Sequence, residues 1–160
     1  MAVKTVGKEL SPEAELRSFL DRFDPQQQKL FRAVRTALRQ RFPTVNELAY
    51  AYPNSVVLSY SPSHRGIEAV VALALRADGL VLHLSHGPQL PDPQHLLQGS
   101  GKATRFIPIT AAGQLRQPAV AALIAAAVAH AQIPLPAEGK GQLIIQSSGA
   151  KRRPARQAAK

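Results

Sequence analysis

The sequence contains no cysteine. Disulfide bonds, thiolate metal sites and cysteine nucleophiles are therefore excluded, and a zinc site would have to use histidine and carboxylate ligands alone. No apolar run approaches the ~20 residues that cross a bilayer, and residues 1–15 lack the apolar core of a signal peptide. From these absences we expect a cytoplasmic protein that does not enter a membrane.

Acidic residues are few, 10 against 20 Lys and Arg, which gives a net charge of +10. The excess is uneven, because residues 140–160 contain six basic side chains and no acid, which leaves 14 basic against 10 acidic side chains in residues 1–139. A nucleic acid would meet this tail through non-specific, salt-dependent contacts with Lys151, Arg152, Arg153 and Arg156. The alternative is a solvated, disordered tail that has no partner.

The length of 160 residues and the hydrophobic content of 45% fit one globular domain. We place an N-terminal arm at 1–10, the domain at 11–135 and a basic, disordered tail at 136–160. Within this tail, residues 143–145 are a candidate for a marginal strand.

Three helices are indicated by their start signals and apolar periodicity. Ser11 and Asp24 are N-cap residues, and each is followed by a proline that suits the first helical position. They predict helices over 12–23 and 25–42, the second with an apolar stripe and with arginines mostly on its other faces. An alanine-rich helix is predicted over 118–132.

The central part of the chain changes from helical to strand periodicity. Residues 45–52 alternate, which places Val45, Glu47, Ala49 and Ala51 on one side and Asn46, Leu48, Tyr50 and Tyr52 on the other. Segments 56–61, 67–77 and 80–85 continue an antiparallel meander, and 104–109 is a further strand weakened by a proline. A short helical turn is expected over 94–97. The order predicts an α+β fold, an antiparallel sheet of about five strands with helices packed on one face.

The run GSGKAT, which begins at Gly99, has the look of a phosphate-binding loop. A Walker A loop needs a glycine five residues before its Gly-Lys pair and a hydroxyl residue after it. Here those positions hold Leu96 and Ala103, and the loop leads into a strand rather than a helix. We therefore interpret the run as a bend whose glycines supply backbone freedom.

Three stretches resemble the YdhG-like family of small bacterial proteins: PTVNELAYAYP at 43–53, GLVLHLSHG at 79–87 and GSGKATRFIPI at 99–109. The resemblance covers roughly 11–131, and the sequence departs from the family's glycines at Ala51 and Ala103. It implies a sandwich of helices on one antiparallel sheet, frataxin-like in outline.

The resemblance also implies a function, since one branch of the family is regarded as an intracellular iron carrier of frataxin type. Iron delivery would need exposed carboxylates, because hard iron ions prefer oxygen ligands. The acidic cluster that this reading would use consists of Glu9, Glu13, Glu15, Asp21 and Asp24. The alternative is that these side chains are helix N-terminal charges and solvated residues.

A ligand pocket is predicted around Glu47, which has alanine neighbours on its strand face and is expected to be partly buried. We expect it to pair with Lys102 or Arg105 of the glycine loop, so that a cationic loop facing a carboxylate forms a small anion or ligand pocket beside Tyr50. The alternative is a salt bridge that only ties the loop to the sheet.

Histidines and tyrosines offer further hypotheses. His83, His86 and His95 are near in sequence, and three histidines can bind zinc, although solvated or capping roles are the simpler reading. Tyr50, Tyr52 and Tyr60 with Arg65 would stack nucleic-acid bases if they shared an exposed sheet face, against a packing role. The neighbours Ser85 and His86, and likewise Ser63 and His64, point apart in a strand and form no nucleophile–base pair.

The sequence thus predicts a non-enzymatic, YdhG-like binding or accessory domain, monomeric or homodimeric, without catalytic residues or a cofactor. Its partner is an unidentified small ligand or protein. One alternative is weak nucleic-acid association through the basic tail and the arginine-rich second helix. The other is an iron carrier.

Overall fold

The computed structural model describes residues 10–147, which form an α+β fold around one six-stranded sheet. The strands are β1 (Asn46–Tyr52), β2 (Ser55–Ser61), β3 (Val71–Arg76), β4 (Gly79–Ser85), β5 (Thr104–Ile109) and β6 (Leu143–Ser147). Their spatial order is β5-β4-β3-β2-β1-β6, with β6 parallel to β1 and every other pair antiparallel. The predicted fold class is confirmed.

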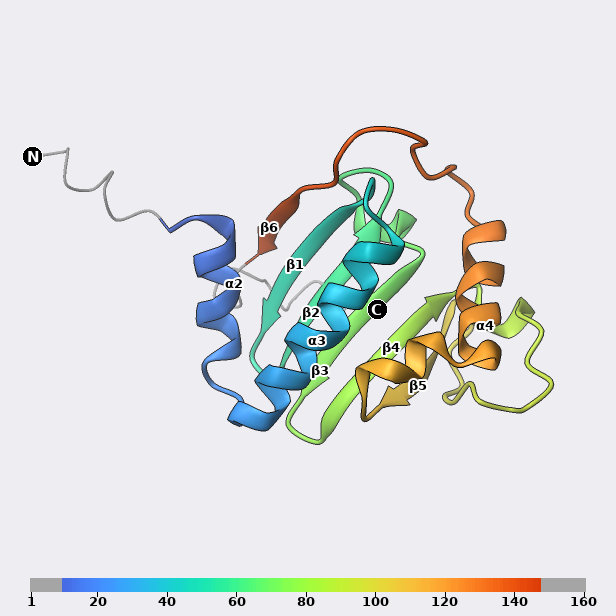
Figure 1. Cartoon of the computed structure of the whole chain (residues 1–160), viewed down its shortest axis with the longest axis horizontal. Coiled ribbons are helices and arrows are strands. Elements are labelled where there is room, and N and C mark those ends of the chain that lie inside the picture. Colours follow the sequence, from blue (N-terminus) through green and yellow to red (C-terminus); the bar gives the residue numbers. More distant parts are fainter. Residues whose placement is uncertain (1–9, 148–160) are drawn as a thin grey trace, which may run out of the picture.

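The helices lie on one face of the sheet (Figure 1). They are α2 (Pro12–Leu20), α3 (Pro25–Arg41) and α4 (Pro118–Ala129), with three single 3₁₀ turns at η1 (Gly66–Glu68), η2 (Gly87–Gln89) and η3 (Ala112–Arg116). No helix in the described part of the chain is long and apolar enough to span a bilayer.

The predicted N-caps hold both N-terminal helices in place. The Ser11 hydroxyl accepts a hydrogen bond from the Ala14 amide at 3.1 Å, and the Asp24 carboxylate accepts one from the Gln26 amide at 3.0 Å. Each bond satisfies an amide that has no partner within its helix. These caps fix where α2 and α3 begin, and so which of their side chains face each other.

The core lies between the helices and the sheet. Phe31, Val34 and Leu38 of α3 are completely buried, as are Leu58 and Leu73 of the central strands. Burying a large apolar side chain contributes about 1.5–3 kcal/mol, so this stripe fixes the rotation of α3 about its axis. The residues beside the stripe are consequently held at the edge of the core.

The alternation predicted for β1 is confirmed on the helix-facing side. Val45 and Ala49 belong to the core, and Glu47 between them is also buried. The register pairs Glu47 with Tyr60 of β2, which places these two side chains on the same face beneath α3.

Two local predictions need correction. The marginal strand expected over 143–145 is present as the edge strand β6, which pairs in parallel with β1 over 143–147 and needs its bounds extended. Residues 94–97 contain no helical turn. The Asp92 carboxylate accepts hydrogen bonds from the amides of Leu96 and Leu97 instead, and His95 adopts a left-handed conformation with φ of 55°.

Candidate functional site

Glu47 carries the most heavily bonded carboxylate in the described part of the chain, with 0% of its surface exposed. Its Oε1 accepts from Arg35 Nη2 at 2.8 Å and from Arg39 Nη1 at 2.6 Å. Its Oε2 accepts from Arg35 Nε at 2.9 Å and from the Tyr60 hydroxyl at 2.7 Å. A carboxylate offers about four lone-pair positions, so Glu47 has no capacity left for a ligand.

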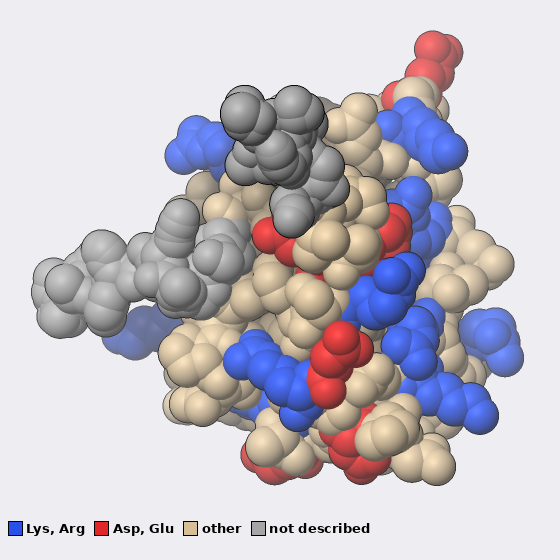
Figure 2. Space-filling model, turned by 90° about the vertical axis from the view of Figure 1, so that its left-hand side faces the viewer, with Lys and Arg blue, Asp and Glu red and all other residues tan. Residues whose placement is uncertain are grey.

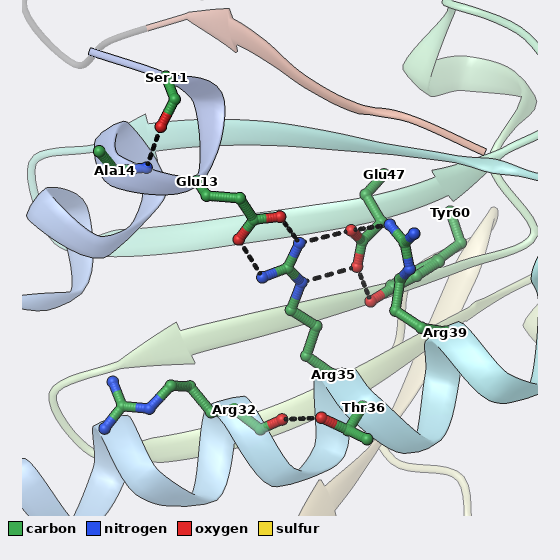
Figure 3. A network of polar contacts seen from close by, with 9 residues as sticks. All are labelled: Ser11, Glu13, Ala14, Arg32, Arg35, Thr36, Arg39, Glu47 and Tyr60. Atoms are coloured by element: carbon green, nitrogen blue, oxygen red, sulfur yellow. Dashed lines mark hydrogen bonds and ion pairs between the residues drawn. The ribbon is translucent and has the colours of Figure 1, made fainter. Parts of the chain in front are cut away.

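The arginines reach Glu47 because of their spacing on α3. Arg35 and Arg39 are four residues apart, so they lie on the same side of the helix. Arg35 follows Val34 and Arg39 follows Leu38, two residues of the buried apolar stripe. The two arginine side chains are only 17% and 31% exposed. Figure 3 shows both guanidinium groups reaching from α3 toward the Glu47 carboxylate on β1.

A second carboxylate binds the adjacent edge of the Arg35 guanidinium, which shares Nη2 with the edge bound by Glu47. Glu13 of α2 accepts two hydrogen bonds, from Nη1 at 2.9 Å and from Nη2 at 2.8 Å, in the bidentate geometry typical of arginine–carboxylate pairs. Unlike Glu47, the Glu13 side chain is 57% exposed. Arg35 is therefore held between a buried carboxylate and one that water reaches (Figure 3).

The pKa shifts in this cluster follow from its contacts. The hydrogen bond from Arg35 lowers the pKa of Glu13 below its ordinary value. Burial acts to lower the pKa of Arg35, but its hydrogen bonds to Glu13 and Glu47 outweigh this effect and raise it. Burial and the adjacent Glu47 charge raise the pKa of Tyr60 well above its ordinary value, so the phenol stays protonated and donates its hydrogen bond.

Glu13, Arg35 and Arg39 line an open groove of about 460 Å³ between α2 and α3. We call it the arginine groove, and its lining residues are Glu13, Arg32, Arg35, Thr36, Arg39 and Gln40. The Arg32 guanidinium is exposed and has no hydrogen-bond or ion-pair partner within residues 10–147. Figure 2 shows basic side chains gathered on the side of the molecule that carries α2, with fewer acidic ones among them.

Two other hollows are similar in size, about 610 and 500 Å³, but they are lined by two arginines and one arginine, respectively. In the first, the Arg22 guanidinium donates to three backbone carbonyls around the β1–β2 turn. Arg76 Nε is buried there, lies 3.9 Å from Asp78 and has no hydrogen-bond partner within residues 10–147. In the second, Arg65 pairs with Glu68 at 3.4 Å. The arginine groove is smaller than the first, yet it has the larger surplus of hydrogen-bond donors, which matters more for recognising a charged ligand.

The predicted pairing of Glu47 with Lys102 or Arg105 is wrong. Glu47 is buried and paired as expected, but its partners come from α3 and β2. Arg105 lies on β5 at the far edge of the sheet, four strand positions from β1, which corresponds to ~19 Å at the usual spacing of ~4.8 Å. The glycine loop therefore cannot face this carboxylate.

The other residues of the predicted pocket lie apart. Lys102 is exposed, and Arg105 Nε donates to the Gly101 carbonyl at 2.8 Å, so this cation closes its own loop. Tyr50 is half-buried on the other sheet face, where its ring stacks on Tyr52 with centroids 6.1 Å apart. The structure does not bring these residues together with Glu47 into one pocket.

The histidine and acidic clusters are likewise not assembled. No group of three or more His, Asp or Glu side chains positioned to hold a metal ion occurs among residues 10–147. The His83 ring packs against Phe106 with centroids 5.7 Å apart, whereas the His86 ring faces His130 at the same distance. Of the acidic cluster, Asp24 caps α3, and Glu9 lies outside the described residues.

The base-stacking hypothesis also needs correction for Tyr60, which is fully buried on the helix side while Tyr50 and Tyr52 lie on the opposite face. The four tail residues proposed to meet nucleic acid, Lys151, Arg152, Arg153 and Arg156, lie outside the described part of the chain.

Sequence reasoning missed Arg35 and Arg39 as partners of Glu47, and Glu13 as their neighbour. A usable signal was present, since two arginines four residues apart border an apolar stripe. What the sequence did not contain was the position of α3 over β1, which depends on the packing of the whole core.

No protein-family model, no curated protein and no solved structure matches this chain. The residues of the arginine groove are therefore the main indication of function, and the YdhG-like resemblance remains an expectation.

Proposed function

We propose that this protein is a non-enzymatic binding module whose ligand is a small anion, carrying phosphate or carboxylate groups, held in the arginine groove. The observation that carries the proposal is a surplus of arginine donors in one open groove. Arginine suits this role because its planar guanidinium matches both carboxylate and phosphate oxygens.

The surplus can be counted from the hydrogen bonds. A guanidinium has five N–H donors, and Arg35 uses four of them on Glu13 and Glu47. Arg39 uses one, on Glu47, and no partner within residues 10–147 accepts from Arg32. Three positive and two negative side chains thus line or adjoin the groove, so that it carries a positive charge with donors to spare.

The alternatives named from the sequence receive less support. The arginines of α3 would also attract nucleic-acid phosphates, but such binding is insensitive to any single cation and falls steeply with salt. An iron site would need several free carboxylates, whereas Glu13 is bonded to Arg35 and Asp24 caps α3.

Titration calorimetry with pyrophosphate as the probe tests this proposal. We expect Arg32→Gln to weaken binding about tenfold, the effect of losing one charged hydrogen-bonding partner. Arg116→Gln is the matched control, since it removes the same charge from an exposed arginine on η3 that does not line the groove. Equal losses in the two variants, or no binding to the wild type, would count against the proposal.

A further inference from the structure

We infer that the Glu13 carboxylate occupies the ligand's place on Arg35, and that the ligand carries two anionic groups, one replacing Glu13 and the other binding Arg32. This inference rests on the proposed function and specifies its ligand class and its regulation. It makes Glu13 a built-in competitor rather than a permanent part of the fold.

The two carboxylates on Arg35 differ in how firmly they are held. Glu47 is fully buried and accepts four hydrogen bonds from three side chains. Glu13 is 57% exposed, and within residues 10–147 its carboxylate accepts hydrogen bonds from Arg35 alone. Because an ion pair with a largely exposed partner contributes little free energy, Glu13 can exchange Arg35 for water at little cost, whereas Glu47 cannot.

The edge of Arg35 that Glu13 covers is a preformed oxyanion receptor. Nη1 and Nη2 donate in parallel at 2.9 and 2.8 Å to the two oxygens of one carboxylate. A ligand carboxylate or phosphate presents the same pair of oxygens to the same fork. The other edge of the guanidinium is fixed by Glu47, which keeps the fork aimed into the groove when Glu13 departs.

The second anionic group of the ligand is inferred from the position of Arg32. It lies three residues before Arg35 on α3, so the two side chains leave the helix about 5–6 Å apart. In Figure 3 the Arg32 guanidinium extends from α3 without a hydrogen bond to the residues drawn. Because the Arg32 side chain is exposed and has no partner within residues 10–147, it can turn toward Arg35, and a short molecule with two anionic groups, such as a diphosphate or a small dicarboxylate, would then bind both arginines at once.

Displacing Glu13 does not require α2 to leave the protein. Leu16 and Leu20 anchor this helix in the core with 2% and 3% of their surface exposed, and Ser11 caps its first turn. Glu13 lies in that first turn, so a rotation of its side chain toward water is enough to free Arg35. The competition is therefore a local side-chain exchange.

The first experiment measures the affinity for pyrophosphate in wild type and three variants by titration calorimetry, with circular dichroism to verify folding. Glu13→Gln removes the competing charge, and Glu13→Asp keeps the charge but shortens the side chain, so both should bind pyrophosphate several-fold more tightly. Glu15→Gln is the matched control, because it removes a charge from the same turn without touching Arg35, and it should change the affinity less than about twofold. Unchanged or weaker binding in both Glu13 variants, with normal wild-type binding, would overturn the competitor role.

The second experiment compares ligands that carry one or two anionic groups. Wild type should bind pyrophosphate about tenfold more tightly than orthophosphate, and succinate more tightly than acetate. The pair with the larger ratio of affinities shows whether the site prefers phosphate or carboxylate groups. Arg32→Gln should abolish this preference. Equal affinities for one-group and two-group ligands would overturn the ligand class while leaving the proposed function intact, whereas a complete lack of binding would contradict the proposed function itself.

Discussion

Two cationic regions lie at opposite ends of the same sheet, and they differ in what surrounds each charge. The glycine loop carries Lys102 and Arg105, close together in sequence, yet one is exposed and the other donates to its own loop. The arginine groove gathers Arg32, Arg35 and Arg39 over about two turns of α3. Only the arginine groove has a buried carboxylate beside it, Glu47, whose hydrogen bonds fix the direction of Arg35 and Arg39.

The difference between the two regions shows that a motif-like sequence does not by itself make a binding site. Glycine beside lysine is typical of phosphate-binding loops, but neither Lys102 nor Arg105 is paired with a carboxylate within residues 10–147. In the groove, Glu47 anchors the Arg35 and Arg39 guanidinium groups by three hydrogen bonds, and Arg35 presents its Nη1 and Nη2 to the exposed Glu13 carboxylate. Preorganised donors bind an anion without the cost of ordering flexible side chains.

The largest loss of stability is expected when Glu47 is replaced, because this carboxylate is what distinguishes the arginine groove from the glycine loop. Glu47→Gln should lower the free energy of unfolding by about 3 kcal/mol, because Arg35 and Arg39 lose their buried counter-charge. Lys102→Gln, at the other end of the sheet, should change it by no more than about 0.5 kcal/mol. Urea denaturation of both variants measures the difference, and equal effects would contradict our account of the two regions.

A smaller loss of stability is expected when the Tyr60 hydroxyl is removed, because this hydroxyl donates one of the four hydrogen bonds to Glu47. Tyr60→Phe removes one donor from the buried carboxylate and should cost about 1–2 kcal/mol of unfolding free energy. Tyr52→Phe is the control, since the Tyr52 hydroxyl makes no hydrogen bond within residues 10–147, and it should be nearly neutral.

The raised pKa of Tyr60 also predicts that the stability of the fold depends on pH in the alkaline range. Its raised pKa means that the unfolded chain loses this proton first, so stability is fully present below about pH 10 and falls as the pH rises further. Tyr60→Phe should lack this part of the alkaline decline. A decline of the same size in wild type and variant would contradict the assignment.

The smallest effect concerns Glu13, the exposed partner of Arg35. Its pKa is lowered from its ordinary value of 4.5, so its contribution to stability is present above pH 4.5 and is lost as the pH falls through the lower folded value. Because the side chain is largely exposed, this contribution should stay below about 1 kcal/mol. Urea denaturation of wild type and Glu13→Gln should show that difference at pH 7 and almost none at pH 2. A difference that persists at pH 2 would show a role other than charge.

Much of the fold follows from local signals in the sequence. Ser11 and Asp24 mark the helix starts, and period two in 45–52 predicts both β1 and the side on which Glu47 lies. The edge strand β6 is predicted from the sequence only as a marginal strand, because residues 143–147 are held by parallel pairing with β1, far away in the sequence. Such pairing leaves no local pattern beyond a short apolar run.

The site was only half predictable. The burial of Glu47 was expected from its alanine neighbours, but its partners were sought among cations near glycines rather than on a helix 12 residues earlier. The choice between them is decided by strand order, which places Arg105 at the far edge of the sheet, and by the rotation of α3, which the core stripe sets. Both are properties of the assembled core rather than of any segment.

The most direct test of the account is an NMR titration with pyrophosphate that follows the arginine Nε–Hε resonances of the full chain. The account predicts that the Arg32 and Arg35 signals shift together and saturate, that Arg116 stays unchanged, and that the same shifts saturate at lower concentration in Glu13→Gln. Shifts confined to Arg152, Arg153 and Arg156, or spread evenly over all arginines, would contradict it.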